Sequence, residues 1–158
     1  MRLALAVGLK KDGIRLWRTG TWVLAGEDRD YGGQVYGLDF HPDSNRLVAS
    51  SFDGDLRLYK VTEVGLSRLI RAVAPGGMRP LGIRFAPDGR RLAVGYFDSP
   101  RVDVLDADDL SLEFTPDLAG VDSGDLSRVA WSGRQLLAGG RWWTADGASP
   151  HPRLGEHG

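Results

Sequence analysis

The chain has 158 residues, of which 42% are hydrophobic and 26% are charged, the balance of an ordinary soluble globular domain. Twenty basic side chains face 21 acidic ones, so there is no basic field to hold nucleic acid or an anionic membrane, and we expect neither as a partner. The chain has no Cys, which excludes disulfides, thiolate metal sites and cysteine nucleophiles and is compatible with a reducing compartment, so we expect a cytoplasmic protein.

The first predicted strands lie at the N-terminus. Leu5 to Gly8 is a run of small and apolar residues that predicts a strand. Asp12-Gly13 predicts a hairpin turn, because both residues tolerate positive φ. Ile14 to Trp17 predicts the next strand, and Trp22 to Ala25 gives a weaker prediction of another.

The N-terminal segment has a second interpretation. Arg2 and the apolar run Leu3 to Leu9 resemble a weak signal peptide, but Lys10-Lys11 follows where a cleavage site needs small residues. The strand is therefore favoured over the targeting segment. No apolar stretch of the sequence is long enough to span a bilayer.

A complete four-stranded unit follows. Apolar side chains alternate at Tyr36, Leu38 and Phe40, which is typical of a strand with one buried face. Asp53-Gly54 is a second hairpin signal. The remaining strands of the unit are expected at 47–50, 56–59 and, more weakly, 67–73.

The same order of elements then recurs. Phe85 follows Phe40 after 45 residues, and Trp131 follows Phe85 after 46. The third unit has expected strands at 81–85, 92–95, 102–105 and 112–115, with a turn at 98–99. The fourth has expected strands at 129–131 and 136–139 and a further strand begun by Trp142-Trp143.

A period of about 45 residues with four short strands in each unit is that of a β-propeller blade. We therefore predict an all-β fold of four-stranded antiparallel blades, arranged radially as an incomplete ring of about three and a half blades. The predicted blades occupy residues 1–146, and a flexible tail follows. The expected segments are 1–30 (partial), 31–75, 76–120, 121–146 (partial) and the tail at 147–158.

The residues from Phe40-His41-Pro42-Asp43 to Asp53-Gly54-Asp55-Leu56-Arg57-Leu58-Tyr59 resemble a WD-repeat blade, as does Phe85-Ala86-Pro87-Asp88-Gly89. The resemblance runs from about Arg2 to Trp142 and is greatest to bacterial WD-repeat arrays, which are often attached to effector or signalling domains. No unit ends in Trp-Asp, and no Gly-His precedes a first strand. The family's Asp-His-Ser/Thr-Trp network therefore cannot form intact, and we expect the blades to rely more on packing and backbone pairing.

Polar residues that could carry chemistry have simpler explanations. His41, His151 and His157 match no metal spacing, and we expect surface histidines and no metal or cofactor. Asp12, Asp53 and Asp98 recur at the repeat period, and we expect them to shape turns, because catalysis needs a unique site whereas folding needs every turn.

Edge loops are the better candidates for a binding site. In a propeller, the loops between second and third strands share one face with the loops that enter each first strand. Tyr and Arg are residue types that dominate interface hot spots. Tyr36 also continues the buried phase of its strand, so an inward orientation is the alternative for it. The candidate partner-binding residues are Tyr31, Tyr36, Phe52, Met78, Arg79, Phe97 and Trp142.

The resemblance implies a non-catalytic protein-interaction scaffold or sensor module, without catalytic residues and with a protein partner. A homo-oligomer that completes the propeller is a further expectation. Two alternatives stay open: a fragment of a larger propeller without independent function, and part of a propeller hydrolase of lactonase-like type whose active site needs further blades.

Overall fold

The computed structural model describes residues 4–119, 126–139, 141–144 and 147. All of its fourteen described elements are strands, grouped in four antiparallel sheets that follow one another along the chain. The first sheet has three strands: β1 (Ala4–Gly8), β2 (Ile14–Arg18) and β3 (Leu24–Asp28). The second has four: β4 (Val35–Phe40), β5 (Arg46–Ser51), β6 (Asp55–Thr62) and β7 (Gly65–Val73).

The other two sheets repeat this plan. The third consists of β8 (Pro80–Phe85), β9 (Arg91–Tyr96), β10 (Val102–Asp106) and β11 (Leu112–Phe114). The fourth consists of β12 (Val129–Ser132), β13 (Gln135–Ala138) and β14 (Arg141–Thr144). In every sheet the strands are ordered as in the sequence. The predicted all-β class and the meander within each blade are therefore confirmed.

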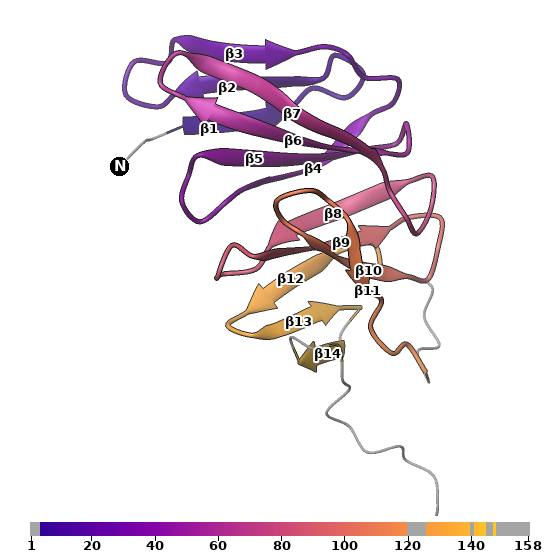
Figure 1. Ribbon diagram of the computed structural model, residues 1–158. Helices are drawn as coiled ribbons and strands as arrows, with labels where there is room; N and C mark the ends of the chain where they lie inside the picture. The colour runs from indigo at the N-terminus through magenta and orange to yellow at the C-terminus, as the bar shows by residue number, and fades with distance from the viewer. Residues whose placement is uncertain (1–3, 120–125, 140, 145–146, 148–158) are drawn as a thin grey trace, which may run out of the picture.

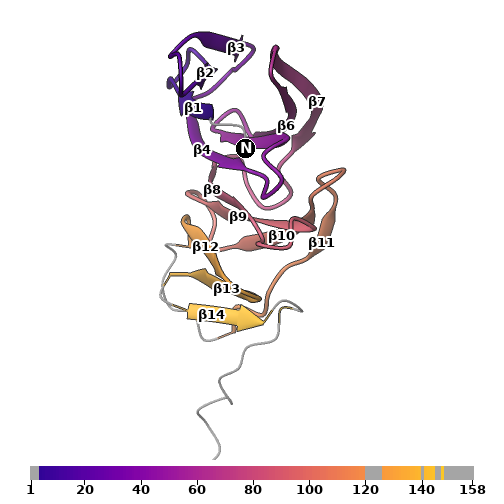
Figure 2. The same ribbon diagram turned by 90° about the vertical axis from the view of Figure 1, so that its left-hand side faces the viewer.

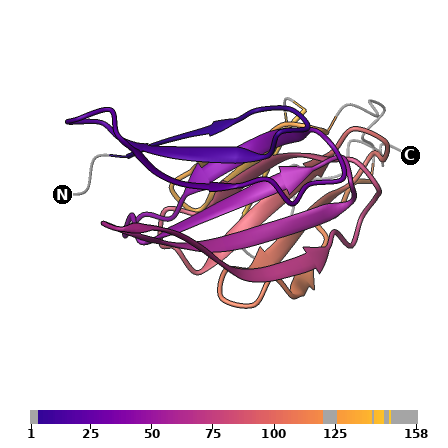
Figure 3. The ribbon, with the colours of Figure 1, turned by 90° about the horizontal axis from the view of Figure 1, so that it is seen from above.

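The sheets stack face to face, from the first sheet to the fourth (Figure 1). The first strands β4, β8 and β12 follow one another along one side of the stack, and the outer strands β7 and β11 lie on the other side (Figure 2). Contacts of β4 with β8 and of β8 with β12 join successive sheets. Seen from above, the sheets overlap one another (Figure 3). This is the arrangement of blades in an incomplete propeller.

Apolar side chains fill the spaces between the sheets. Ile14, Leu16 and Leu47 are buried between the first and second sheets. Leu58 and Val94 belong to the core between the second and third sheets. A third cluster, with Val104 and Leu136, lies between the third and fourth sheets. Stacking therefore buries surfaces that a single blade would leave in water.

The aromatic repeat occupies equivalent backbone positions. Each aromatic pairs with the leucine of the next strand: Phe40 with Leu47, Phe85 with Leu92, and Trp131 with Leu136. Burial differs, however, because Phe85 is buried whereas Phe40 and Trp131 are half-buried. The indole N–H of half-buried Trp131 donates a hydrogen bond to the carbonyl of Arg84 (3.1 Å).

The predicted hairpin glycines are confirmed, since Gly13 and Gly54 have φ values of 78° and 89°. The prediction for β3 was two residues early. Trp22 adopts a φ of 57° and its backbone N–H bonds the carbonyl of Arg18 (2.7 Å), so the turn continues and the strand begins at Leu24. The predicted tail beyond Gly147 lies outside the described residues, and the residue boundaries assigned to the blades stay predictions.

Candidate interaction surface

Two kinds of loop meet at one edge of the stack. Asp98, in the loop between β9 and β10, accepts hydrogen bonds from the backbone N–H groups of Met78 (2.9 Å) and Arg79 (3.1 Å), which enter β8. The backbone N–H of Phe97 donates to the carbonyl of Arg79 (2.9 Å). One carboxylate and one backbone bond thus hold the two loops together.

The second sheet repeats this connection. Asp53 accepts from the backbone N–H of Gly32 (3.0 Å), and the N–H of Phe52 donates to the carbonyl of Gln34 (2.9 Å). Asp53 also accepts from the N–H of Asp55 (3.2 Å) within its own turn. Asp53 and Asp98 thus shape and join loops, as predicted from their recurrence.

Five of the predicted binding residues lie together at this edge. The rings of Tyr36 and Phe52 have centroids 4.2 Å apart, and those of Phe52 and Phe97 are 5.8 Å apart. Met78 lies against Gly54, since a Cβ added to Gly54 would be 3.5 Å from the Cε of Met78. Tyr36, Met78 and Phe97 are 50%, 66% and 59% exposed. We call Tyr36, Phe52, Met78, Arg79 and Phe97 the aromatic patch.

Tyr36 reaches the aromatic patch because β4 is irregular. The register with β5 shifts between Val35 and Gly37, which turns Val35 into the core and Tyr36 outward. The alternation that predicted an inward Tyr36 is therefore broken at that residue. The hydroxyl of Tyr36 donates to the side-chain oxygen of Gln34, which fixes the ring at the surface.

Arg79 is the charged member of the patch. Its guanidinium carbon lies 5.8 Å from the ring centroid of Phe52 and 6.0 Å from that of Phe97. The side chain is exposed, and among the described residues no carboxylate forms an ion pair with it. The patch therefore combines apolar rings with one uncompensated positive charge.

Two predicted binding residues do not join the patch. Tyr31 is half-buried and its hydroxyl bonds that of Tyr59 (2.7 Å), so it belongs to the interior of the stack. Trp142 lies on β14, and its side chain is outside the described part of the structure.

A buried polar network joins the first two sheets, which the sequence did not predict. Arg57 has 0% exposure, stacks 3.8 Å from the ring centroid of Tyr31 and pairs with Asp53 at 2.6 Å. The hydroxyl of Tyr59 donates to Asp28 of β3 (2.9 Å). In this blade other side chains build a polar connection beside the packing and backbone pairing, on which we expected the blades to rely more.

The network changes the acidity of its members. Burial raises the pKa of Tyr31 to about 12 and moves that of Tyr59 upward as well. Burial alone would also raise the pKa of Asp53, but hydrogen bonds from Arg57 and from the backbone of Gly32 outweigh it and hold that pKa at about 2. Asp53 is therefore a carboxylate at neutral pH.

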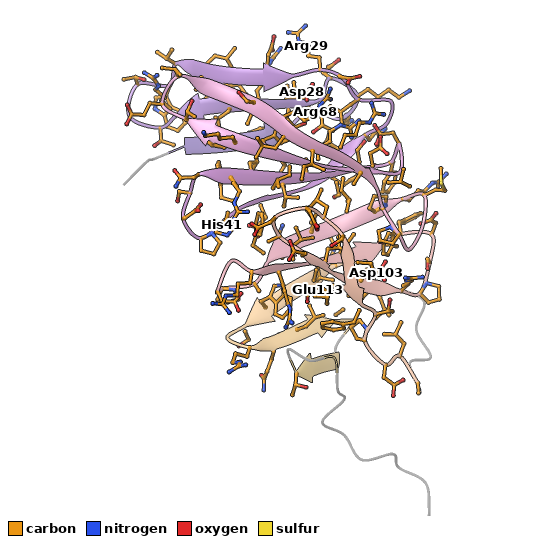
Figure 4. The ribbon with its side chains drawn as sticks, in the orientation of Figure 1. Asp28, Arg29, His41, Arg68, Asp103 and Glu113 are labelled. Atoms are coloured by element: carbon orange, nitrogen blue, oxygen red, sulfur yellow. The ribbon has the colours of Figure 1, made fainter. Side chains whose placement is uncertain are left out.

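Exposed ion pairs extend the connection outward. Arg68 of β7 pairs with Asp28 at 3.4 Å and with Asp30 at 2.8 Å, so the outer strands of the first two sheets are linked by charge (Figure 4). Solvent weakens such pairs, and they add less to stability than the buried pair of Arg57 and Asp53.

The third sheet has a different network at the equivalent place. Asp103, which occupies the register position of Arg57, is also 0% exposed. Its carboxylate accepts from the hydroxyls of Tyr96 (2.8 Å) and Thr115 (2.7 Å) and from Nε of Arg101 (2.7 Å). The stack thus accommodates opposite charges at one position, where each charge has an oppositely charged partner.

A cavity of about 640 Å³ lies at the opposite strand ends, formed by the turns that leave the first and third strands. Arg46 pairs with Asp108 (2.6 Å), and Arg91 pairs with Glu113 (2.5 Å). His41 and Glu113, two of its lining residues, are labelled in Figure 4. The cavity is lined by His41, Arg46, Asp88, Gly89, Arg90, Arg91, Asp106, Asp108, Glu113 and Arg134.

His41 is buried, which corrects the prediction of a surface histidine. Its ring meets that of Phe85 edge-on at 5.0 Å, and its Nε2 lies 2.8 Å from the carbonyl of Gly89. The turn of the third sheet covers the ring, which the local sequence could not show. No group of three His, Asp or Glu residues in the described ranges could hold a metal ion.

The described part of the chain contains no helix able to cross a membrane.

Two comparisons with known proteins agree with this geometry. The family model "WD domain, G-beta repeat" matches residues 27–60, from the end of β3 into β6. The matched unit therefore takes its first residues from one sheet and three strands from the next. A similar protein is WD repeat-containing protein 55 of Arabidopsis thaliana, which is 32% identical over 69 residues. The match covers 44% of this chain and 20% of that relative, so the chain spans only a small part of the relative's length.

Proposed function

We propose that the chain, which matches a WD-repeat model over residues 27–60, is a non-catalytic protein-interaction scaffold that binds its partner through the aromatic patch. The observation that carries this proposal is the convergence of exposed Tyr36, Met78 and Phe97 on one edge, around Phe52. Clusters of exposed aromatic residues on a protein surface are typical of binding sites.

The loops that carry the patch are held in place before any partner arrives. Asp98 joins the loop of Phe97 to that of Met78 and Arg79. Ordered loops lose little conformational entropy on binding, so more of the contact energy remains as affinity.

The hydrolase alternative is favoured by no described feature. The carboxylates closest to the patch, Asp53 and Asp98, accept hydrogen bonds from backbone N–H groups and so serve the loops. A binding role needs only the exposed side chains, and it is the function that this edge supports best.

We also propose that copies of the chain associate through the two outermost sheets. Trp17 and Leu24 pair on the face of the first sheet turned away from buried Leu16. Leu137 lies on the outer face of the fourth sheet, opposite buried Leu136 and Ala138. In the described residues no sheet covers either face.

Selection of peptides from a random display library on the full chain tests the scaffold proposal. We expect enriched peptides that lose at least about tenfold in affinity for the double variant Met78→Ser, Phe97→Ser, since hot-spot truncations cost more than 1 kcal/mol each. The matched control is Val64→Ser, Leu69→Ser, which removes apolar side chains that are 88% and 52% exposed elsewhere. Equal loss in both double variants, or no enriched peptide, would refute the proposed function.

A further inference from the structure

We infer that the aromatic patch selects a peptide segment with one carboxylate side chain between apolar residues. Arg79 binds the carboxylate, and the neighbouring apolar side chains pack on Phe52, Phe97 and Met78. This inference rests on the proposed function and names the chemical class of the partner.

Charge supplies the first step of the argument. Other arginines near this edge already have carboxylate partners: Arg57 has Asp53 at 2.6 Å, Arg71 has Asp55 at 2.5 Å, and Arg101 has Asp103 at 2.7 Å. Arg79 has none among the described residues. A planar guanidinium binds a carboxylate through two parallel N–H···O bonds. An acidic side chain is therefore the group that would pair with the charge of Arg79.

The nearest carboxylate of the chain does not take this role. Asp98 directs both oxygens at backbone N–H groups, that of Arg79 at 3.1 Å and that of Met78 at 2.9 Å. It therefore fixes the backbone from which the Arg79 side chain projects. The guanidinium of Arg79 is therefore available to a group of a partner molecule.

The rings determine what surrounds the carboxylate. The guanidinium of Arg79 lies about equally far from Phe52 and Phe97, at 5.8 and 6.0 Å. Aromatic rings beside a cation exclude water, and an ion pair is stronger where the local dielectric constant is lower. Exposed Phe97 and Met78 then favour apolar side chains next to the acidic one.

The dimensions of the patch fit a short extended segment. The centroids of Tyr36, Phe52 and Phe97 are separated by 4.2 and 5.8 Å in succession. An extended chain rises about 3.3 Å per residue, so about three residues span the rings. The expected core is therefore an acidic residue with an apolar residue on each side.

Defined peptides test the inference. The probes are fluorescent nonapeptides with blocked ends, a Ser-Gly background and the core Phe-Asp-Leu, Phe-Asn-Leu, Phe-Lys-Leu or Ser-Asp-Ser, titrated against the full chain. We expect the Phe-Asp-Leu peptide to bind about tenfold more tightly than the Asn peptide, as a charge-assisted pair predicts. The Lys and Ser-Asp-Ser peptides should bind more weakly still, and added salt should reduce the preference for Asp.

Variants assign the preference to Arg79. Arg79→Gln should make the Asp and Asn peptides bind equally, whereas Arg79→Lys should keep part of the difference. Arg134→Gln is the control, because Arg134 is an exposed arginine at the opposite edge, on the cavity. All of these side chains are exposed, so the variants should unfold at the temperature of the original chain.

Several results would overturn the inference: no peptide binds, Asp and Asn peptides bind equally, the Lys peptide binds best, or the Asp preference survives Arg79→Gln. These outcomes are separable from failure of the proposed function. Display peptides that need Met78 and Phe97 but contain no acidic residue would refute carboxylate recognition and leave the scaffold function in place. Display peptides that ignore Met78 and Phe97 would refute the scaffold function itself.

Discussion

Arg57 shows how one residue decides whether two sheets can pack. Its guanidinium is fully buried, and it replaces lost water with Asp53, with the carbonyl of Asp30 (3.0 Å) and with the ring of Tyr31. A buried charge is tolerated only when its pairing is nearly complete. Because Asp30 and Tyr31 lie in the loop that enters the second sheet, the side chain of Arg57 also holds that loop.

Loss of Arg57 should therefore be costly. We expect Arg57→Met to lower the free energy of unfolding by about 3 kcal/mol, because the Asp53 carboxylate would remain buried without its cation. Arg71→Met, which removes a half-exposed partner of Asp55, should cost less than about 1 kcal/mol. Urea unfolding measures both. A similar small loss in the two variants would contradict the structural role assigned to Arg57.

Asp53 should give stability a characteristic dependence on pH. Its pKa is lowered from 3.8 to about 2 in the folded chain, so the carboxylate stabilises the fold fully above the unfolded value. That contribution is lost as the pH falls through 3.8 toward about 2. We expect the difference in unfolding free energy between the original chain and Asp53→Asn to shrink over this interval. A difference that is independent of pH would show that Asp53 does not ionise with the lowered pKa.

At the scale of strands, the sequence predicted the positions of the strands better than the orientation of their side chains. Alternation located the first strands and runs of small apolar residues located the second strands, because these signals are local. The outward turn of Tyr36 arises from a shift of register between β4 and β5, and the burial of His41 depends on the turn of the third sheet. Both are effects of neighbours that local periodicity does not contain.

The candidate site was predictable to a similar extent. Loop position and residue type identified five members of the aromatic patch, since propeller topology brings those loops to one edge. Tyr31 belongs to the same loops, but Arg57 draws it into the interior. The inward position of Tyr31 depends on its contact with buried Arg57, which is distant in the sequence and which local patterns do not contain.

The third and fourth sheets approach each other closely at a glycine of β9. A Cβ added to Gly95 of β9 would lie 2.3 Å from the carbonyl oxygen of Leu126, at the entrance of the fourth sheet. We expect Gly95→Ala to destabilise the chain by about 1–3 kcal/mol, since the obstructing atom is backbone. Gly20→Ala is the control, because nothing lies within 4 Å of its added Cβ. Thermal unfolding of the two variants should differ clearly, and equal melting temperatures would contradict the close packing of the third and fourth sheets.

At the scale of the molecule, the stack has two end faces that differ from its interior. The second and third sheets are covered on both sides, and consequently β6 and β10 are buried along most of their length. On the first and fourth sheets, Leu24 and Leu137 are 47% and 36% exposed on faces that no described sheet covers. Apolar surface of this kind gains free energy when another sheet covers it.

Association of two copies, end face to end face, would give eight sheets, since each chain supplies four. A head-to-tail contact closes only when the rotation completes a ring, and eight blades lie within the range of closed propellers. We expect the isolated chain to sediment faster than a monomer at micromolar concentrations. The double variant Leu24→Lys, Leu137→Lys should shift it to a monomer, because charge on the end faces opposes their burial. Val64→Lys adds the same charge at an exposed turn and should leave association unchanged. A chain that stays monomeric at every concentration and binds no hydrophobic dye would show that the end faces are stable in water, and this assembly would then be wrong.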